Sequence, residues 1–257
     1  MEPITILEGT KGLVAKIYWD ESPENPREMF DHAGTIVGVE QRNQQVPTDK
    51  GFASFRKGEV LGFIMDYILS KEALIKVEEL EESLSYKKRD SFIEEEANRD
   101  AVILGITQSQ DGSMFADSDW NEYGVDGIAF MTKATVIKEY GSWDDETRSK
   151  ATNLLKAEVS ELGSWCSGNV YGYIVEDEAG EVVDSCWGFY GLDYCEQEAR
   201  EALKSAESER PEYQVEIHSA VERISNLNPE SIRESLKTLH DENPAEYRVV
   251  MNWILGE

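Results

Sequence analysis

The sequence has few of the residues that enzymes most often use to hold a metal or activate a nucleophile. It contains three histidines and three cysteines in 257 residues. Cys166, Cys186 and Cys195 are odd in number and lack the paired spacing of zinc ligands, which favours reduced thiols in a cytosol. There is also no Gly-rich phosphate loop of the Walker or dinucleotide type. We therefore assign no catalytic residue, no metal ligand and no cofactor from the sequence.

Basic residues are scarce as well. Lys and Arg number 25 against 52 Asp and Glu, which gives a formal net charge of −27. A field of this sign repels nucleic acid and anionic membranes and attracts proteins with a basic surface. We expect a protein partner of that kind, with mimicry of DNA as one form of binding. The alternative is that the charge only keeps the protein in solution.

Long apolar runs are absent too. No stretch approaches the ~20 apolar residues of a membrane-spanning helix, and the N-terminus, Met1-Glu2-Pro3-Ile4, lacks the features of a secretory signal. Hydrophobic residues nevertheless make up 40% of the chain, which is enough for a folded core. We expect a soluble protein of the cytoplasm.

The residue pattern predicts an α+β fold with a mainly antiparallel sheet and flanking helices. Short β-prone runs between turn residues predict strands at 4–7, 13–19, 35–39, 101–106, 127–131, 169–176 and 181–189. Helical spacing predicts a helix over 60–98, with a phase slip near Ser70. Ser142 with Asp145, and Asp193 with Glu196, resemble capping boxes that begin two further helices, the second running to about Ser205.

Two Asn-Pro pairs predict a helical tail at the C-terminus. Asn228-Pro229 and Asn243-Pro244 each place a capping residue before a proline at the first helical position. We divide the chain into an α+β core domain, residues 1–205, and a helical C-terminal extension, residues 206–257. The tail would pack on the core or drive assembly into a homo-oligomer.

One polar loop stands out as a candidate functional loop. Its charged residues are Asp20, Glu21, Glu24, Arg27, Glu28, Asp31 and His32. Carboxylates with a histidine can bind a divalent metal or act as general acid and base. Because about one residue in five is acidic, such a cluster also arises from composition alone. A partner-binding loop is the first interpretation, and a metal-dependent hydrolase is the alternative.

Aromatic residues flank the predicted hairpin of 169–189. The candidates are Trp165, Tyr171, Tyr173, Trp187 and Tyr190. Aromatics that stack on nucleic-acid bases are accompanied by a basic groove, which this acidic chain is not expected to have. Core packing or a hot spot for protein binding is the better interpretation.

Several strings together resemble an uncharacterised family of accessory proteins encoded by tailed phages and prophages. They are Asp20 to Glu28 (DESPENPRE), Phe30 to Val37 (FDHAGTIV), Asp119-Trp120 with Gly127 to Phe130 (GIAF), Gly168 to Tyr173 (GNVYGY) and Asp184 to Gly191 (DSCWGFYG). The resemblance covers about residues 13–205. Where that family often carries His-Ser-Gly and Cys-Pro-Trp-Asp-Ser-Gly, this chain reads Gln110-Asp111-Gly112 and Ser118-Asp119-Trp120-Asn121-Glu122.

The resemblance implies a phage-encoded protein that acts in the host cytoplasm. With the acidic charge and the lack of a complete catalytic set, it favours a non-enzymatic binder or inhibitor of a host defence or nucleic-acid-handling protein. The metal-dependent hydrolase and a structural or assembly protein remain the alternatives.

Overall fold

The fold was analysed in a computed structural model, which describes residues 2–10, 12–40, 46–56, 58–81, 86–117, 119–120, 125–208 and 229–255. The chain divides into two compact units. Unit 1 comprises residues 1–22 and 170–257, and unit 2 comprises residues 23–169. The predicted core domain 1–205 therefore spans both units, and its boundary falls inside a helix of unit 1.

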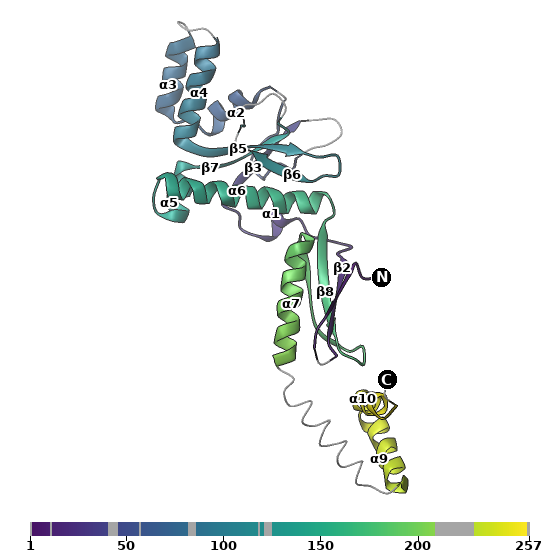
Figure 1. Cartoon of the computed structure of the whole chain (residues 1–257). Helices are drawn as coiled ribbons and strands as arrows, with labels where there is room; N and C mark the ends of the chain where they lie inside the picture. Colours follow the sequence, from purple (N-terminus) through teal and green to yellow (C-terminus); the bar gives the residue numbers. More distant parts are fainter. Residues whose placement is uncertain are drawn as a thin grey trace. The chain divides into compact units, whose positions relative to one another are not determined.

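Unit 1 is built on a four-stranded antiparallel sheet. Its strands are β1 (Thr5–Glu8), β2 (Val14–Trp19), β8 (Val170–Glu176) and β9 (Val182–Tyr190), in the order β1-β2-β8-β9. The hairpin of β8 and β9 confirms the predicted one, and β2 pairs with β8 although about 150 residues separate them. Helix α7 (Leu192–Ser208) runs beside this sheet (Figure 1).

Period-two alternation decides which face of this sheet is buried. Ala15 and Ile17 of β2 lie opposite Val175 and Tyr173 of β8, and all four are buried against the apolar side of α7. The residues between them point to the other face, because successive side chains of a strand alternate. One face of the sheet therefore forms the core of unit 1.

Unit 2 has a five-stranded sheet with helices on both faces. Its strands are β3 (Thr35–Glu40), β4 (Phe55–Arg56), β5 (Ala101–Gln108), β6 (Met114–Asp117) and β7 (Gly127–Thr132), in the order β4-β3-β7-β5-β6. Among these strands, β3 and β4 pair in parallel and the other pairs are antiparallel.

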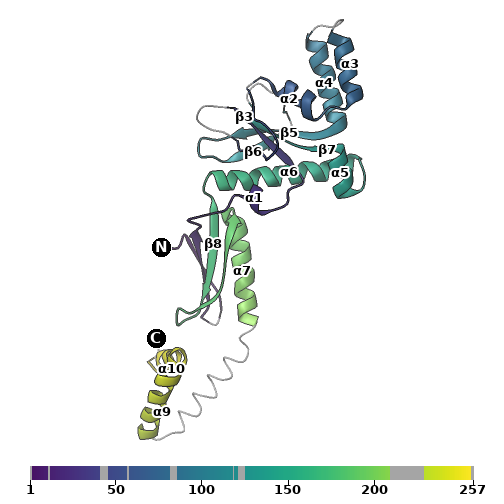
Figure 2. The ribbon, with the colours of Figure 1, turned by 180° about the vertical axis from the view of Figure 1, so that it is seen from behind.

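The helices of unit 2 form two layers. On one face lie α2 (Val60–Tyr67), α3 (Lys71–Glu81) and α4 (Tyr86–Asp100), and on the other lie α1 (Pro26–Met29), α5 (Lys133–Tyr140) and α6 (Asp145–Cys166). Figures 1 and 2 show the sheet between these layers from opposite sides. Residues 101–106 are buried without interruption, as expected for a strand covered on both faces. The α+β prediction is confirmed.

Several helix boundaries differ from their predictions. The helix predicted over 60–98 is broken at Ser70, whose hydroxyl accepts a hydrogen bond from the N–H of Ala73 at the start of α3. The capping residue of α6 is Asp144, which forms a capping box with Thr147, and not Ser142. Ser142 instead donates to the Asp144 carboxylate. Asp193 lies within the first turn of α7 and does not precede it.

The two C-terminal helices begin at the predicted prolines. They are α9 (Pro229–Glu242) and α10 (Pro244–Leu255). The side chain of Asn243 accepts a hydrogen bond from the N–H of Glu246, as the Asn-Pro pattern predicts. The first half of the predicted extension, residues 209–228, lies outside the described residues.

Candidate functional site

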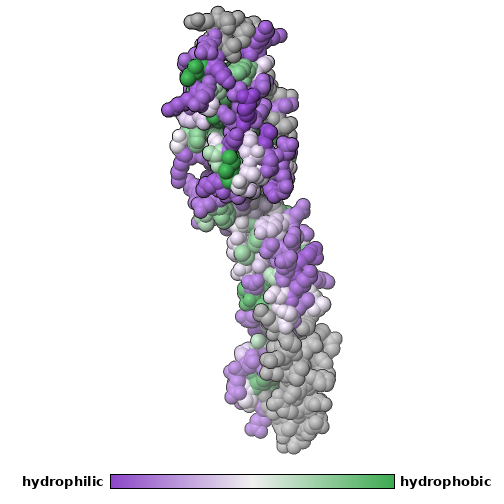
Figure 3. Space-filling model, turned by 90° about the vertical axis from the view of Figure 1, so that its left-hand side faces the viewer, coloured by the Kyte–Doolittle hydropathy of each residue, from purple (hydrophilic) through white to green (hydrophobic). Residues whose placement is uncertain are grey.

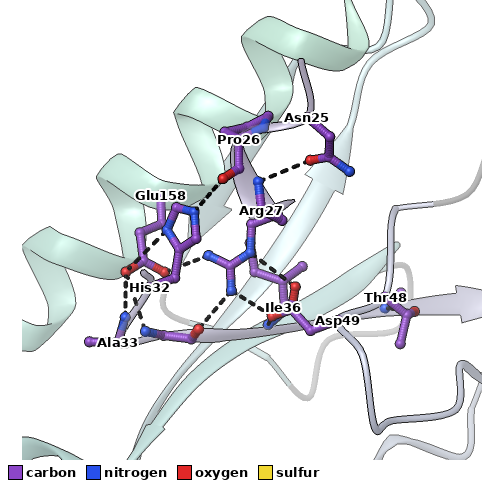
Figure 4. Close-up of polar contacts among 11 residues, drawn as sticks. Asn25, Pro26, Arg27, His32, Ala33, Ile36, Thr48, Asp49 and Glu158 are labelled. Atoms are coloured by element: carbon purple, nitrogen blue, oxygen red, sulfur yellow. Dashed lines mark hydrogen bonds and ion pairs between the residues drawn. The ribbon is translucent and has the colours of Figure 1, made fainter. Parts of the chain in front are cut away.

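A buried polar cluster centres on Arg27, in the predicted functional loop. Asn25 caps the single turn of α1 by accepting a hydrogen bond from the N–H of Arg27, and Pro26 occupies the first helical position. This turn directs the Arg27 side chain toward Glu158 of α6 and Asp49, which follows β3 in the chain (Figure 4). We call Arg27, His32, Asp49 and Glu158 the Arg27 cluster.

The Arg27 guanidinium uses several of its donors within this cluster. Nε donates to Asp49 Oδ1 at 2.9 Å and Nη2 donates to Asp49 Oδ2 at 2.5 Å, which makes a two-point ion pair. Nη1 donates to Glu158 Oε2 at 2.8 Å. Nη2 also donates to the Gly34 carbonyl at 2.7 Å. Arg27 thereby joins α1, the start of β3, the segment after β3 and α6.

The carboxylates of the cluster also bind backbone. Glu158 Oε1 accepts from the N–H groups of Ala33 and Gly34 at 3.2 and 3.3 Å. Asp49 Oδ2 accepts from the N–H of Ile36 at 2.7 Å. These contacts satisfy charges that would otherwise be costly to bury.

His32 closes the cluster on the α1 side. Its Nε2 lies 2.9 Å from the Pro26 carbonyl oxygen, which can only accept, so Nε2 carries a proton. Its Nδ1 lies 3.8 Å from Glu158 Oε1. Both His32 and Arg27 are therefore engaged within unit 2.

Electrostatics of the cluster follow from its burial. The side chains of Arg27 and Glu158 are only 7% and 6% exposed. Burial alone lowers the pKa of the Arg27 guanidinium, but its hydrogen bonds to Asp49 and Glu158 outweigh burial and raise that pKa. Burial also raises the pKa of the nearby Glu161 carboxyl. The cluster keeps Arg27 charged and acts as a clamp that holds residues 25–36 against α6.

The other charged residues of the loop do not converge on this cluster. Glu21, Glu24, Glu28 and Asp31 are exposed. Glu28 lies 3.7 Å from the exposed Lys50, a weak surface pair. Asp20 accepts a hydrogen bond from the N–H of Ser22. Among the described residues, no group of three or more His, Cys, Asp or Glu side chains is arranged to hold a metal ion. The loop geometry thus offers no support for the metal-dependent hydrolase.

Sequence reasoning missed Asp49 and Glu158. One signal was available for Glu158, because it lies between Leu155, Val159 and Leu162 on the apolar face of α6, where a carboxylate requires a buried partner. No comparable signal marks Asp49.

The aromatic candidates fall into different environments. Trp165 belongs to α6 in unit 2, packs against its core, and donates from Nε1 to the Pro23 carbonyl at 3.1 Å. Tyr171 and Tyr173 are buried under α7 in unit 1. Tyr190 is half-buried at the end of β9, and Trp187 is 44% exposed. The structure therefore groups four of the five candidates on the hairpin and separates Trp165 from them.

Trp187 lies on the sheet face opposite α7. Its ring crosses Gly172, where an added Cβ would come within 2.2 Å of an indole carbon. Tyr18 stacks beside it, with ring centroids 6.4 Å apart. The register places Ile6, Tyr18, Ile174, Val182 and Trp187 on this one side. We call it the open face.

The apolar residues of the open face lie around the Lys16–Glu176 ion pair, which the register places on the same face, and the unit as a whole is acidic. Ile6 is 54% exposed and Val182 is 61% exposed. Residues 1–22 and 170–208 contain 14 Asp and Glu against 4 Lys and Arg, a net charge of −10. Hydrophilic residues also dominate the side of the molecule in Figure 3, where hydrophobic residues form separate patches. Exposed aromatic and aliphatic side chains inside a charged surround are typical of protein-binding surfaces.

Two of the three cysteines, Cys166 and Cys195, are poorly suited to nucleophilic catalysis. Burial raises the pKa of Cys166 to about 11, and burial with nearby negative groups raises that of Cys195 to about 12. Few thiolates therefore form at neutral pH in either residue, and the thiolate is the reactive species.

Comparison of the chain with family models, curated proteins and solved structures finds no match. Among the described residues, no helix has the length and apolar character needed to cross a membrane.

Proposed function

We propose that the protein is a non-enzymatic binder that uses the open face of unit 1 to engage a protein with a basic surface. The observation that carries the proposal is the open face itself. It exposes Ile6 on the edge strand β1 and Val182 and Trp187 on the opposite edge strand β9, in a unit with a strong excess of carboxylates. Apolar anchors supply affinity, and the surrounding charge steers a basic partner and selects against acidic ones.

The motifs that resemble phage accessory proteins extend the proposal to a biological setting. The partner would be a defence or nucleic-acid-handling protein of the bacterial host, met in the host cytoplasm. Proteins that grip DNA or RNA carry the basic surfaces that this chain would attract. The proposal does not include mimicry of DNA, because the open face, on which the proposal rests, is centred on apolar side chains.

The test is capture of host proteins by the purified, tagged protein, followed by direct affinity measurement with the recovered partner. We expect a basic partner whose affinity falls as salt rises from about 0.05 to about 0.5 M, because the Debye length shortens from above 10 Å to below it. Ile6→Lys should weaken binding about tenfold or more, since it removes an apolar contact and adds a charge that repels the partner.

Ile75→Lys is the matched control. Ile75 is 56% exposed on α3 in unit 2 and Ile6 is 54% exposed, so the two variants change the same residue type, exposure and net charge. A partner that binds equally well to both variants, or whose affinity does not depend on salt, would overturn the proposal.

A further inference from the structure

The edge strand β9 differs from the other edges in the described residues. Both sheets end in edge strands: β1 and β9 in unit 1, and β4 and β6 in unit 2. β1, β4 and β6 have four, two and four residues, whereas β9 has nine. Among the described residues β9 pairs with β8 alone, so its outer edge has no strand beside it.

Native proteins usually protect such an edge by keeping it short, by placing charged residues or proline in it, or by bulges that twist it away. β9, with the sequence VVDSCWGFY, is long, contains no lysine or proline and has a single charged residue, Asp184, and its first six residues are all exposed. Its composition is instead rich in β-branched and aromatic residues, which favour strand pairing. The edge is therefore suited to accept another strand.

Two register shifts define which part of β9 can pair. They lie between Val175 and Glu176 and between Tyr171 and Gly172 of β8, and they leave residues 184–187 of β9 as a regular stretch. Within it, the N–H of Ser185 donates to Asp184 Oδ1 at 2.8 Å. The N–H of Asp20 donates to the Val170 carbonyl, so in the same register Ile174 bonds to β2, and its β9 neighbour Ser185 directs its N–H away from β8. This N–H is thus on the outer edge, where the Asp184 carboxylate occupies the place of a partner carbonyl.

The two sides of this stretch have different chemistry. On the open face of the stretch lie Ser185 and the exposed Trp187, and Val182 follows on the same side beyond the register shift. On the α7 side, Asp184 lies 3.3 Å from the Tyr173 hydroxyl, and Glu198 of α7 is also within electrostatic range of that hydroxyl. A strand added to β9 would meet apolar groups on one face and carboxylates on the other.

We propose that the outer edge of β9 binds an extended partner segment as a fifth strand, and that this segment alternates apolar residues with lysine or arginine. The proposal rests on the function proposed above and specifies how the partner binds. Alternation follows from the side-chain period of two in a strand. The charge disfavours a second copy as the occupant, because each chain carries −27 and like charges facing each other oppose pairing.

The probe is a blocked eight-residue peptide of alternating lysine and valine, labelled for fluorescence anisotropy. Two relatives of it serve as controls: one has glutamate in place of lysine, and the other carries N-methyl groups on alternate backbone nitrogens. We expect the lysine peptide to bind and the glutamate peptide not to bind. The N-methylated peptide should bind about tenfold more weakly or worse, because it keeps the charge and loses ladder hydrogen bonds.

The matched protein variants are Ser185→Pro and Ser185→Ala. Proline removes the outward N–H without removing a bond to β8, and edge positions of this kind tolerate it. Ser185→Pro should weaken binding of the lysine peptide about tenfold, while Ser185→Ala should leave the affinity for that peptide unchanged. Thermal unfolding of both variants verifies that the fold is kept.

The outcomes separate this inference from the function on which it rests. Equal binding of the plain and N-methylated peptides, or equal affinity of the two Ser185 variants, would reject strand addition. A dimer in sedimentation experiments that Ser185→Pro abolishes would identify a second copy as the occupant and also reject it. If host-protein binding depends on Ile6 but not on Ser185→Pro, the open face binds the partner and the edge does not.

Discussion

Replacing Arg27 with alanine should destabilise unit 2 by about 3–5 kcal/mol, the usual cost of leaving buried charges without their partner. The magnitude follows from the surroundings. Glu158 is 6% exposed and Asp49 is 19% exposed, so water would replace the lost guanidinium poorly. The Gly34 carbonyl would lose a donor as well. A loss of this size is a large part of the total stability of an ordinary domain.

The assay is urea unfolding combined with hydrogen exchange, because a chain with two units need not unfold in a single step. Exchange in segments of unit 2 should accelerate, above all in residues 25–36 and around Glu158. Lys50→Ala is the control, since it also removes a cation paired with a carboxylate, but at 3.7 Å and with the lysine side chain 91% exposed. It should leave stability nearly unchanged.

A double-mutant cycle sharpens the prediction. Arg27→Met combined with Glu158→Gln should cost less than the sum of the two single changes, because the pair of charges is removed together. A cost below about 1 kcal/mol for Arg27→Ala, or additive effects in the cycle, would refute the account of the cluster as a buried electrostatic clamp.

Three further predictions concern other residues. Gly34→Ala should destabilise unit 2 by about 1–3 kcal/mol in urea unfolding, because its Cβ would lie 2.4 Å from a Leu155 methyl carbon and 2.6 Å from a Glu158 oxygen. Glu161→Gln should raise the free energy of unfolding at pH 7 more than at low pH. Burial raises the folded-state pKa of Glu161, so its ionised form costs stability above that pKa and its protonated form does not. Iodoacetamide at pH 8 should label the exposed Cys186 well before Cys195, as peptide mass spectrometry will measure, because Cys195 is buried with a pKa of about 12.

The Asn-Pro pattern that predicts the start of a helix near the C-terminus also occurs at the start of α1. Asn243-Pro244 correctly predicted the start of α10, and Asn25-Pro26 is the same pattern within the candidate loop. The local signal was sufficient for a helical turn, whereas the hydrogen bond from Arg27 to Glu158 of α6 has no local signal in the sequence.

What the sequence determined by itself is largely local. Alternation and turn residues located the strands of the β8–β9 hairpin, and the phase slip near Ser70 marked the break between α2 and α3. These features depend on residues a few positions apart, where propensity, capping and side-chain period act directly.

The tertiary structure alone decided which distant residues meet. It joined Arg27 to Glu158 across 131 positions, placed β2 beside β8, and assigned Trp165 and Trp187 to different units. Strand pairing and ion pairing depend on the position of chain segments in space. The residues around a strand or a charged side chain do not identify the distant segment with which it pairs. For the same reason, the sequence suggested an acidic protein with a functional loop at 20–32, whereas the fold buried Arg27 of that loop and, among the strands that the structure describes, left the outer edge of β9 unpaired.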